Sequence, residues 1–363
     1  MGVRFFFKFV VGMISLSLST LNALDKSSFY ELHRQPIYQW IGEQIQNDLT
    51  PFDKEFRRTS LDEIFATQGE SLCLTRVQIS QGQITIQKSE CAQRHIIPNE
   101  IIPHLFALNE LIPLPDIDFL FTSFDYLSRE MSWPIFVLSK QKEAKGILFP
   151  DWFALNDFEP DKSQILIGNK TYPWEVKKNC LFFRGMDSGV FDLTKWWEYP
   201  RAKLIALSLQ YPSLIDARFS FTLHNRIMLD AAISKGFMGN WVYMNDHPSS
   251  KYLMDIDGNC AATPRFPLYL FSNSVILKNM TNSVLWFYKS IKPHTHFIPV
   301  EEDLSDLFVQ LEWAKNNDDK CREISKNATE LAEKNLTQEV AYLYLYHLLK
   351  EYSIKQRSQY NLQ

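Results

Sequence analysis

The chain has 363 residues, 45% of them hydrophobic and 14% aromatic, so it can bury the core of one large domain or of two ordinary ones. This composition argues against extended disorder, and a formal net charge of −4 gives no electrostatic reason to bind nucleic acid. We therefore expect a globular protein whose partners are not nucleic acids.

The first 23 residues have the layout of a secretory targeting segment. Arg4 and Lys8 precede an apolar run that reaches Leu21 and is short for a membrane span, and Ala23 is a small residue suited to cleavage. Leu21 stands where a small residue is usual, so a cleaved signal peptide and an uncleaved anchor both stay open. The segment predicts the secretory pathway lumen (ER or Golgi) in a eukaryote or the cell envelope in a bacterium, with membrane association if it is retained.

A hairpin is expected after a helical first region. Residues 24–70 carry apolar side chains at helical spacing, and LCLTRVQISQGQITIQKSEC then alternates apolar and polar residues around a turn at Gln81-Gly82. Cys73 and Cys91 flank this hairpin and can form a disulfide in an oxidising compartment. The five cysteines show no C-x-x-C spacing and no clustered histidines, which argues against a zinc site.

The middle of the chain predicts short strands punctuated by proline, and then an alternating pattern. Buried strands are expected at 117–125, 134–140, 164–169 and 180–185. From about residue 181, strand, loop and helix alternate, with a helix at 201–210 and further strands at 214–220, 274–279 and 296–300. Such alternation is typical of a parallel sheet covered by helices.

The C-terminal part predicts three helices, capped by Asp303, by Asp318 or Asp319, and by Thr337. We therefore expect an α/β protein of two lobes with a cleft between them, closed by C-terminal helices. The expected divisions are residues 1–23, an N-terminal lobe at 24–170, a C-terminal lobe at 171–340 and a final helix at 341–363.

The segment KYLMDIDGNCAATPRF contains two candidate sites. Asp255 and Asp257 form a D-x-D triplet, which can hold a divalent cation or can serve as turn residues before Gly258. The run from Asn259 to Arg265 offers small residues, a hydroxyl and a guanidinium, which suit a diphosphate but also fit a tight turn with a surface arginine.

Two further candidates follow apolar strands. CLFFRG delivers Arg184 and Gly185 to the end of a buried strand, where ligands bind in open α/β sheets, whereas Lys177 and Lys178 by themselves are typical of a solvated face. Asp125 ends an apolar strand before a polar loop, so it can be a cap or turn residue, or a general base at the edge of a cleft.

In their order and spacing, DIDFLFTSFDY, WEVKKNCLFFRG, SKYLMDIDGNCAATPRF and HFIPVEEDLSDL resemble the Rumi-like protein O-glucosyltransferases and capsule-associated xylosyltransferases, glycosyltransferase family 90. The similar run covers about residues 110–355. The resemblance implies a GT-B fold with two Rossmann-like lobes, the acceptor on the N-terminal lobe and a UDP-sugar on the C-terminal lobe. It also implies inverting transfer of glucose or xylose to a protein, glycan or lipopolysaccharide hydroxyl without an essential metal.

Carried over residue by residue, the resemblance implies that Asp125 is the catalytic base, although Phe124 and Leu127 replace the family's arginine and proline. The implied donor-binding residues are Arg184, Gly185, Met186, Ser188, Lys251, Tyr252, Cys260, Ala261, Ala262, Thr263, Pro264 and Arg265. Asp255 and Asp257 then become turn residues, and no cofactor or metal is expected because Arg265 replaces the cation.

Two alternatives stay open. Met186 replaces a small hydroxyl residue of the family, and this change, with those around Asp125, suits a catalytically impaired member that only binds a glycan or UDP-sugar. The other alternative is a metal-dependent transferase or phosphoesterase that uses Asp255 and Asp257.

Overall fold

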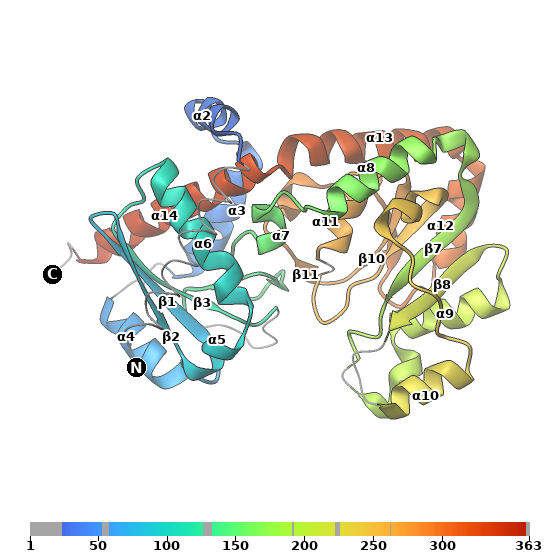
Figure 1. Ribbon diagram of the computed structural model, residues 1–363, viewed down its shortest axis with the longest axis horizontal. Coiled ribbons are helices and arrows are strands. Elements are labelled where there is room, and N and C mark those ends of the chain that lie inside the picture. The colour runs from blue at the N-terminus through green and yellow to red at the C-terminus, as the bar shows by residue number, and fades with distance from the viewer. Residues whose placement is uncertain are drawn as a thin grey trace, which may run out of the picture. The chain divides into compact units, whose positions relative to one another are not determined.

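The computed structural model describes residues 24–52, 58–125, 133–190, 192–221, 226–261 and 263–360 (Figure 1). The expected signal peptide or anchor at 1–23, together with Leu127 and Ala262, lies outside the described residues. Within the described ranges, no helix is long and apolar enough to cross a membrane. The chain divides into two compact units: unit 1 comprises Met1–Asp157, Val284–Lys289 and Thr337–Gln363, and unit 2 comprises Phe158–Ser283 and Ser290–Leu336.

Unit 1 contains a mixed five-stranded sheet in the order β2-β1-β3-β4-β6. Its strands are β1 (Leu74–Ser80), β2 (Gln83–Lys88), β3 (Ile117–Thr122), β4 (Ile135–Val137) and β6 (Ile147–Leu148). β1 is antiparallel to β2 and β3, whereas β3, β4 and β6 are parallel. The expected hairpin is confirmed, because Gln81 and Gly82 both adopt the positive φ that a two-residue hairpin turn requires.

The helices of unit 1 are α2 (Lys26–Arg34), α3 (Gln39–Leu49), α4 (Arg58–Gln68), α5 (Glu90–Arg94), α6 (Ile97–Leu111), α7 (Trp152–Leu155) and α14 (Gln338–Tyr360). The short elements η1 (Thr50–Phe52) and β5 (Lys140–Gln141) complete this part of the chain. The helical expectation for 24–70 is confirmed, but the expectation that only short strands follow the hairpin was wrong at α6. Pro98 lies in the first turn of α6, where a proline is tolerated, and the apolar face of the helix is buried.

Unit 2 contains a fully parallel five-stranded sheet in the order β12-β10-β9-β7-β8. Its strands are β7 (Lys178–Met186), β8 (Ile215–Phe221), β9 (Ser250–Asp255), β10 (Val275–Met280) and β12 (Ile298–Glu301). The parallel sheet expected from the alternating pattern is therefore confirmed. Because the strands are parallel, the residues that follow β7, β9 and β10 gather at one edge of the sheet.

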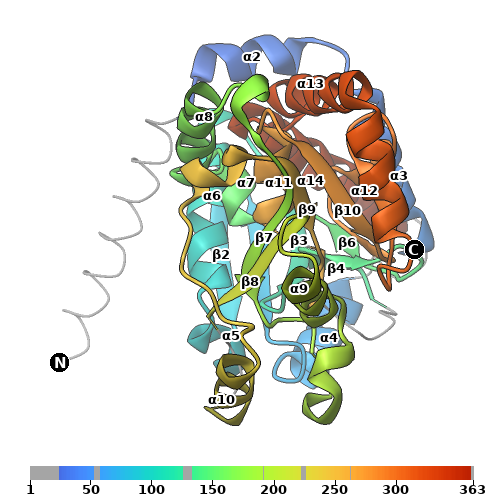
Figure 2. The same cartoon turned by 90° about the vertical axis from the view of Figure 1, so that its right-hand side faces the viewer.

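The helices of unit 2 are α8 (Asp161–Thr171), α9 (Pro200–Gln210), α10 (Arg226–Ser234), α11 (Arg265–Leu270), α12 (Leu307–Asn316) and α13 (Asp318–Asn335). The short elements are η2 (Trp174–Val176), η3 (Leu193–Glu198), η4 (Met244–Ser249), η5 (Tyr288–Ser290) and β11 (Ser283–Val284), the last two lying where the chain passes between units. Figure 2 labels the helices around the sheet, and apolar residues of α9, α12 and α13 share one core with β7, β8, β9 and β10.

The strand expected at 164–169 was wrong, because this segment belongs to helix α8. The helix packs closely against η4 at Gly168, where a Cβ would come within 2.3 Å of the Asn245 carbonyl oxygen. This close approach between helix and turn is a tertiary contact that the short apolar run does not reveal. The α/β class itself is confirmed.

The last helix belongs to unit 1. α14 contacts α2, α3, α7 and β3, and its Tyr342, Tyr344 and Tyr352 are fully buried. Tyr344 donates a hydrogen bond to the carbonyl of Leu148 in β6 (3.1 Å). The first crossing between units falls after Asp157 and the last before Thr337, whereas the sequence suggested divisions after residues 170 and 340.

Candidate functional site

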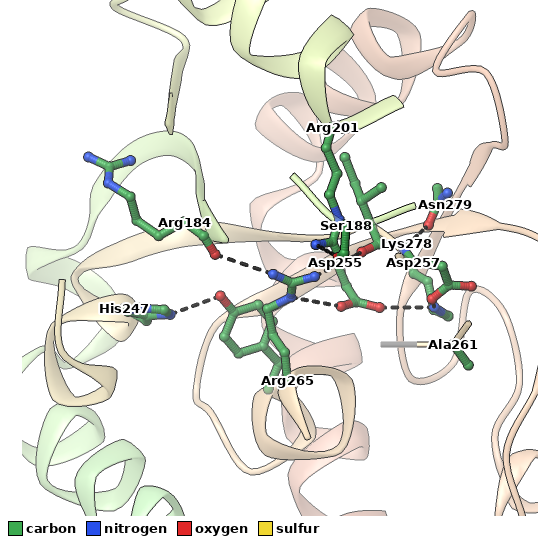
Figure 3. A network of polar contacts seen from close by, with 12 residues as sticks. Arg184, Ser188, Arg201, His247, Asp255, Asp257, Ala261, Arg265, Lys278 and Asn279 are labelled. Carbon is green, nitrogen blue, oxygen red and sulfur yellow. Dashed lines mark hydrogen bonds and ion pairs between the residues drawn. The ribbon is translucent and has the colours of Figure 1, made fainter. Parts of the chain in front are cut away.

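A charged cluster lies at the carboxyl edge of the unit 2 sheet, and Figure 3 shows its members side by side. Asp255 is the last residue of β9 and is fully buried. Its Oδ1 accepts a hydrogen bond from Nε of Arg265 (3.2 Å), the first residue of α11, and its Oδ2 accepts one from Nζ of Lys278 (2.9 Å) on β10. One buried carboxylate thus holds two cations from separate elements.

Arg265 is anchored by the backbone as well as by Asp255. Its Nη2 donates to the carbonyl of Ile256 (2.8 Å), its Nη1 donates to the carbonyl of Arg184 (3.2 Å), and the guanidinium lies 4.9 Å from the Phe183 ring centroid. Gly185 leaves the necessary space, because a Cβ there would stand 2.7 Å from Nη1. These contacts use three of the five N–H donors and fix the plane of the guanidinium at the sheet edge.

The D-x-D triplet does not form the expected turn. Asp255 is a strand residue, and Asp257 is held by the neighbouring strand: its Oδ1 accepts from Lys278 Nζ (2.8 Å) and its backbone N–H donates to Asn279 Oδ1 (3.0 Å). Thr281 donates its hydroxyl to Oδ2 of Asp257 (2.5 Å). The expectation that Asp255 and Asp257 are turn residues was wrong, because both carboxylates pair with Lys278. This lysine lies more than twenty residues further along the chain, so the sequence around the triplet does not reveal the pairing.

Arg201 is a member of this cluster that the sequence reasoning missed. It lies in the first turn of α9, is 7% exposed, and donates to the carbonyls of Met186 (2.9 Å) and Ile256 (2.8 Å) and to the Ser188 hydroxyl. Burial lowers the pKa of Arg201 to about 9, and the positive charge of Arg265 adds to this effect. Its position after Pro200 resembles that of any arginine at a helix start, so only the tertiary structure identifies it.

Two glycines bring the loops after β7 and β9 into backbone contact. Gly189 has φ +87°, and a Cβ there would lie 2.8 Å from the Gly258 carbonyl oxygen. A Cβ on Gly258 would lie 2.5 Å from Oγ of Ser188 and 2.9 Å from Nη2 of Arg201. Asn259 accepts a hydrogen bond from the Gly189 N–H (2.9 Å). A larger residue at Gly189 would press on the backbone of the other loop, and one at Gly258 would displace the side chains of Ser188 and Arg201.

The remaining donor-loop residues connect this cluster to α11. Cys260 is half-buried and accepts a hydrogen bond at its carbonyl from the Gly258 N–H (3.0 Å). Ala261 is fully buried, and Thr263 and Pro264 are half-buried directly before Arg265. Of the residues expected to bind the donor, the structure therefore gathers Gly185, Met186, Ser188, Cys260, Ala261, Thr263, Pro264 and Arg265 around the two loops.

The side chains of three expected donor residues lie elsewhere. Successive strand residues point to opposite faces, so Phe183 faces Arg265 while the Arg184 guanidinium pairs with Asp216 (2.8 Å), away from the cluster in Figure 3. Lys251 lies near the start of β9, where its Nζ bonds Asp318 (2.6 Å). Tyr252 is buried in the apolar core. Arg184 contacts the cluster through its backbone carbonyl, which accepts the hydrogen bond from Arg265, and not through its guanidinium.

Asp125 belongs to unit 1 and follows β3. The residue is exposed, yet the protein around its carboxyl desolvates it and raises its pKa, while the nearby charge of His95 opposes the shift. The His95 ring packs edge-on against Phe124, with the centroids 5.8 Å apart. A carboxylate with a raised pKa is a better proton acceptor than an ordinary aspartate, which suits a general base.

The segment before Asp125 is tied to the hairpin. A disulfide joins Cys73 and Cys91, and the Cys73 carbonyl accepts a hydrogen bond from the Ser123 N–H (3.0 Å). Ligand atoms of the two cysteines and His95 lie within 4.8 Å of one another. The disulfide uses both sulfurs, so this group fits a covalent link and not a metal site.

Comparison with known proteins identifies the family of this chain. The family model described as Glycosyl transferase family 90 matches residues 38–362. The chain belongs to glycosyltransferase family 90. This family 90 chain is 27% identical over 328 residues to protein O-glucosyltransferase 1 of Rattus norvegicus, covering 85% of the chain and 78% of that relative. It is 31% identical over 194 residues to protein O-glucosyltransferase 3 of Homo sapiens, covering 53% and 35% respectively.

A crystal structure of Anabaena Alr3699/HepE in complex with UDP and glucose aligns with 60% of this family 90 chain and 62% of its own, at 9% identity and a TM-score of 0.39. So loose an alignment carries no argument about the site. The family assignment extends the resemblance seen in the sequence, which began at about residue 110, across most of unit 1.

The chemistry available to this glycosyltransferase follows from its charges. Arg265 and Arg201 bring two positive charges to the carboxyl edge of the unit 2 sheet, beside the loops that Gly189 and Gly258 bring into backbone contact. Such an edge suits an anionic ligand. In unit 1, Asp125 can accept a proton.

Proposed function

We propose that this chain is an inverting glycosyltransferase that moves glucose or xylose from a UDP-sugar to a hydroxyl of a protein, glycan or lipopolysaccharide acceptor without a metal ion. The observation that carries the proposal is the anchored Arg265 at the carboxyl edge of the unit 2 sheet, beside the glycine-paired loops. The names of the relatives, protein O-glucosyltransferases, favour glucose and a protein acceptor.

Each group has a role in this proposal. Asp125 removes the proton from the acceptor hydroxyl as that oxygen attacks the anomeric carbon, which inverts its configuration. Arg265, Thr263 and the loop at 184–188 stabilise the diphosphate as negative charge builds on the leaving group. The N-terminal layout of residues 1–23 supports a site of action in the secretory pathway or cell envelope.

The test is a panel of UDP-sugars assayed for UDP release, with and without EDTA. Asp125→Asn should lower turnover by about 10²- to 10⁴-fold, because the amide cannot accept the proton, while UDP affinity stays within about twofold. Glu110→Gln, at another exposed carboxylate of unit 1, is the matched control and should keep full activity. Turnover retained in Asp125→Asn would remove Asp125 from the role of base.

A catalytically impaired member is the second candidate, and the replacement of the family's arginine by Phe124 favours it. That candidate predicts a wild-type protein that binds UDP but releases none from any sugar in the panel. Activity abolished by EDTA would instead support the metal-dependent alternative at Asp255 and Asp257.

A further inference from the structure

The lysine between the two D-x-D carboxylates has no role in the proposed mechanism. We propose that Lys278 is a built-in cation that takes the place of a divalent metal between Asp255 and Asp257, and that it positions Arg265 for the donor diphosphate. The part of this inference that concerns the diphosphate rests on the proposed function. The part that concerns the cation stands on the contacts alone.

The contacts of Lys278 are those of a cation held by two carboxylates. Figure 3 shows Lys278 beside Asp255 and Asp257: its Nζ lies 2.9 Å from Oδ2 of Asp255 and 2.8 Å from Oδ1 of Asp257. The lysine is buried, with 3% of its surface exposed. Lys278 and Asp255 are directly paired in the register of β10 and β9, so the sheet itself fixes their distance. The ammonium also lies 4.5 Å from the Phe266 ring centroid, which closes the site from the side of α11.

The carboxylate oxygens left after Lys278 are engaged as well. Asp255 Oδ1 accepts from Arg265, and Asp257 Oδ2 accepts from Thr281. A hard divalent cation binds carboxylates through these same oxygens, and an ammonium between them would repel it. The triplet therefore resembles a metal-binding motif in sequence but is already neutralised by the protein.

Removal of Lys278 has a specific consequence for Arg265. Asp255 divides its two oxygens between the two cations, so without the ammonium its full charge acts on the guanidinium. Asp257 would add a second negative charge that Lys278 no longer offsets. An incoming diphosphate would then meet a more negative edge and a more strongly paired Arg265, and it would bind less tightly.

The experiment compares wild type with Lys278→Met, Asp257→Asn and the double variant, and uses Lys326→Met as a control at a lysine whose side chain is 75% exposed. Mn²⁺ alone is titrated by the EPR signal of the free ion, and UDP binding is measured by calorimetry in EDTA and in Mn²⁺. We expect wild type to take up no Mn²⁺ and Lys278→Met to take up one ion per chain. In EDTA this variant should bind UDP at least about tenfold more weakly, with part of the loss restored by Mn²⁺.

The double variant removes one charge of each sign and should bind no Mn²⁺ while recovering UDP affinity to within about threefold of wild type. Mn²⁺ uptake by wild type that disappears in Asp257→Asn would overturn the inference, as would wild-type UDP affinity of folded Lys278→Met in EDTA. If Lys278→Met does not fold, the double variant tests the inference instead. A loss of UDP affinity above about tenfold in the double variant would contradict the role of Lys278 in offsetting the charge of Asp257. A wild type that binds no UDP refutes the proposed function, while the Mn²⁺ titrations still test Lys278.

Discussion

Two buried lysines at opposite edges of the unit 2 sheet have different surroundings. Lys278, at the carboxyl edge, lies between two carboxylates. Lys177, directly before β7, donates to the carbonyl of Pro248 and to the Ser274 hydroxyl (3.0 Å), and burial lowers its pKa to about 7. Lys177 is thus held by neutral groups as a structural tie, whereas Lys278 is held among full charges. The lysine that is held among full charges is thus the one at the edge where we propose that the donor diphosphate binds.

The largest effect should come from Asp255, because this carboxylate compensates two cations. Asp255→Asn removes the negative charge that Lys278 and Arg265 share, so the free energy of unfolding should fall by about 3–5 kcal/mol. Urea unfolding followed by tryptophan fluorescence measures it. Asp318→Asn is the control: Asp318 begins α13, pairs with Lys251 near the start of β9 and has a side chain that is 49% exposed, so its loss should cost less than about 1 kcal/mol. Equal losses of unfolding free energy in Asp255→Asn and Asp318→Asn would show that the two edges of the sheet do not differ in this respect.

A smaller effect, of opposite sign, is expected at the amino edge. The folded protein holds Lys177 with a pKa of about 7 against 10.5 for the ordinary side chain, so between these values the unfolded chain binds more protons. Stability should therefore rise from pH 7 towards pH 10 through this residue. Lys177→Met should remove this rise and increase the free energy of unfolding at pH 7 by about 1–3 kcal/mol.

Urea unfolding of both proteins across this pH range tests the prediction. Lys178→Met, at an exposed neighbour, is the control and should leave the pH profile unchanged. A Lys177→Met profile that still rises as steeply as wild type would assign the rise to other groups.

The smallest effect concerns the two glycine-paired loops. Gly258→Ala would place a methyl group 2.5 Å from Oγ of Ser188 and 2.9 Å from Nη2 of Arg201, so these side chains or the loop after β9 must shift and UDP affinity should fall about tenfold. Calorimetry measures the affinity. Gly42→Ala, at a helix position with no atom within 4 Å of the added methyl, should leave UDP binding unchanged. An unaltered affinity in Gly258→Ala would show that the loop spacing does not matter to the nucleotide.

The features predictable from the sequence were those with local causes. The hairpin turn at Gln81-Gly82 and the placement of Gly185 near the end of a strand follow from patterning over a few residues. Lys177 was predicted on a solvated face and is buried instead, because its partners Pro248 and Ser274 lie 71 and 97 residues away. No local pattern reveals such a contact.

Within the candidate site, the error about the D-x-D triplet has the same cause. Asp255 and Asp257 precede a glycine, which favours a turn, but β10 brings Lys278 beside them through strand pairing. Arg201 was missed because its loop partners become neighbours only when β7 and β9 align. Local sequence patterns thus indicate which residue types the site contains, but they do not reveal which of those residues contact one another.

The return of α14 to unit 1 bears on the order in which the protein can fold. Every residue of unit 2 precedes Thr337, so unit 2 is complete before the segment that begins there leaves the ribosome. Unit 1 begins first but still lacks Tyr342, Tyr344 and Tyr352, whose rings are part of its core. During synthesis unit 2 can therefore finish folding first, and a shortened C-terminus would damage unit 1, which carries Asp125.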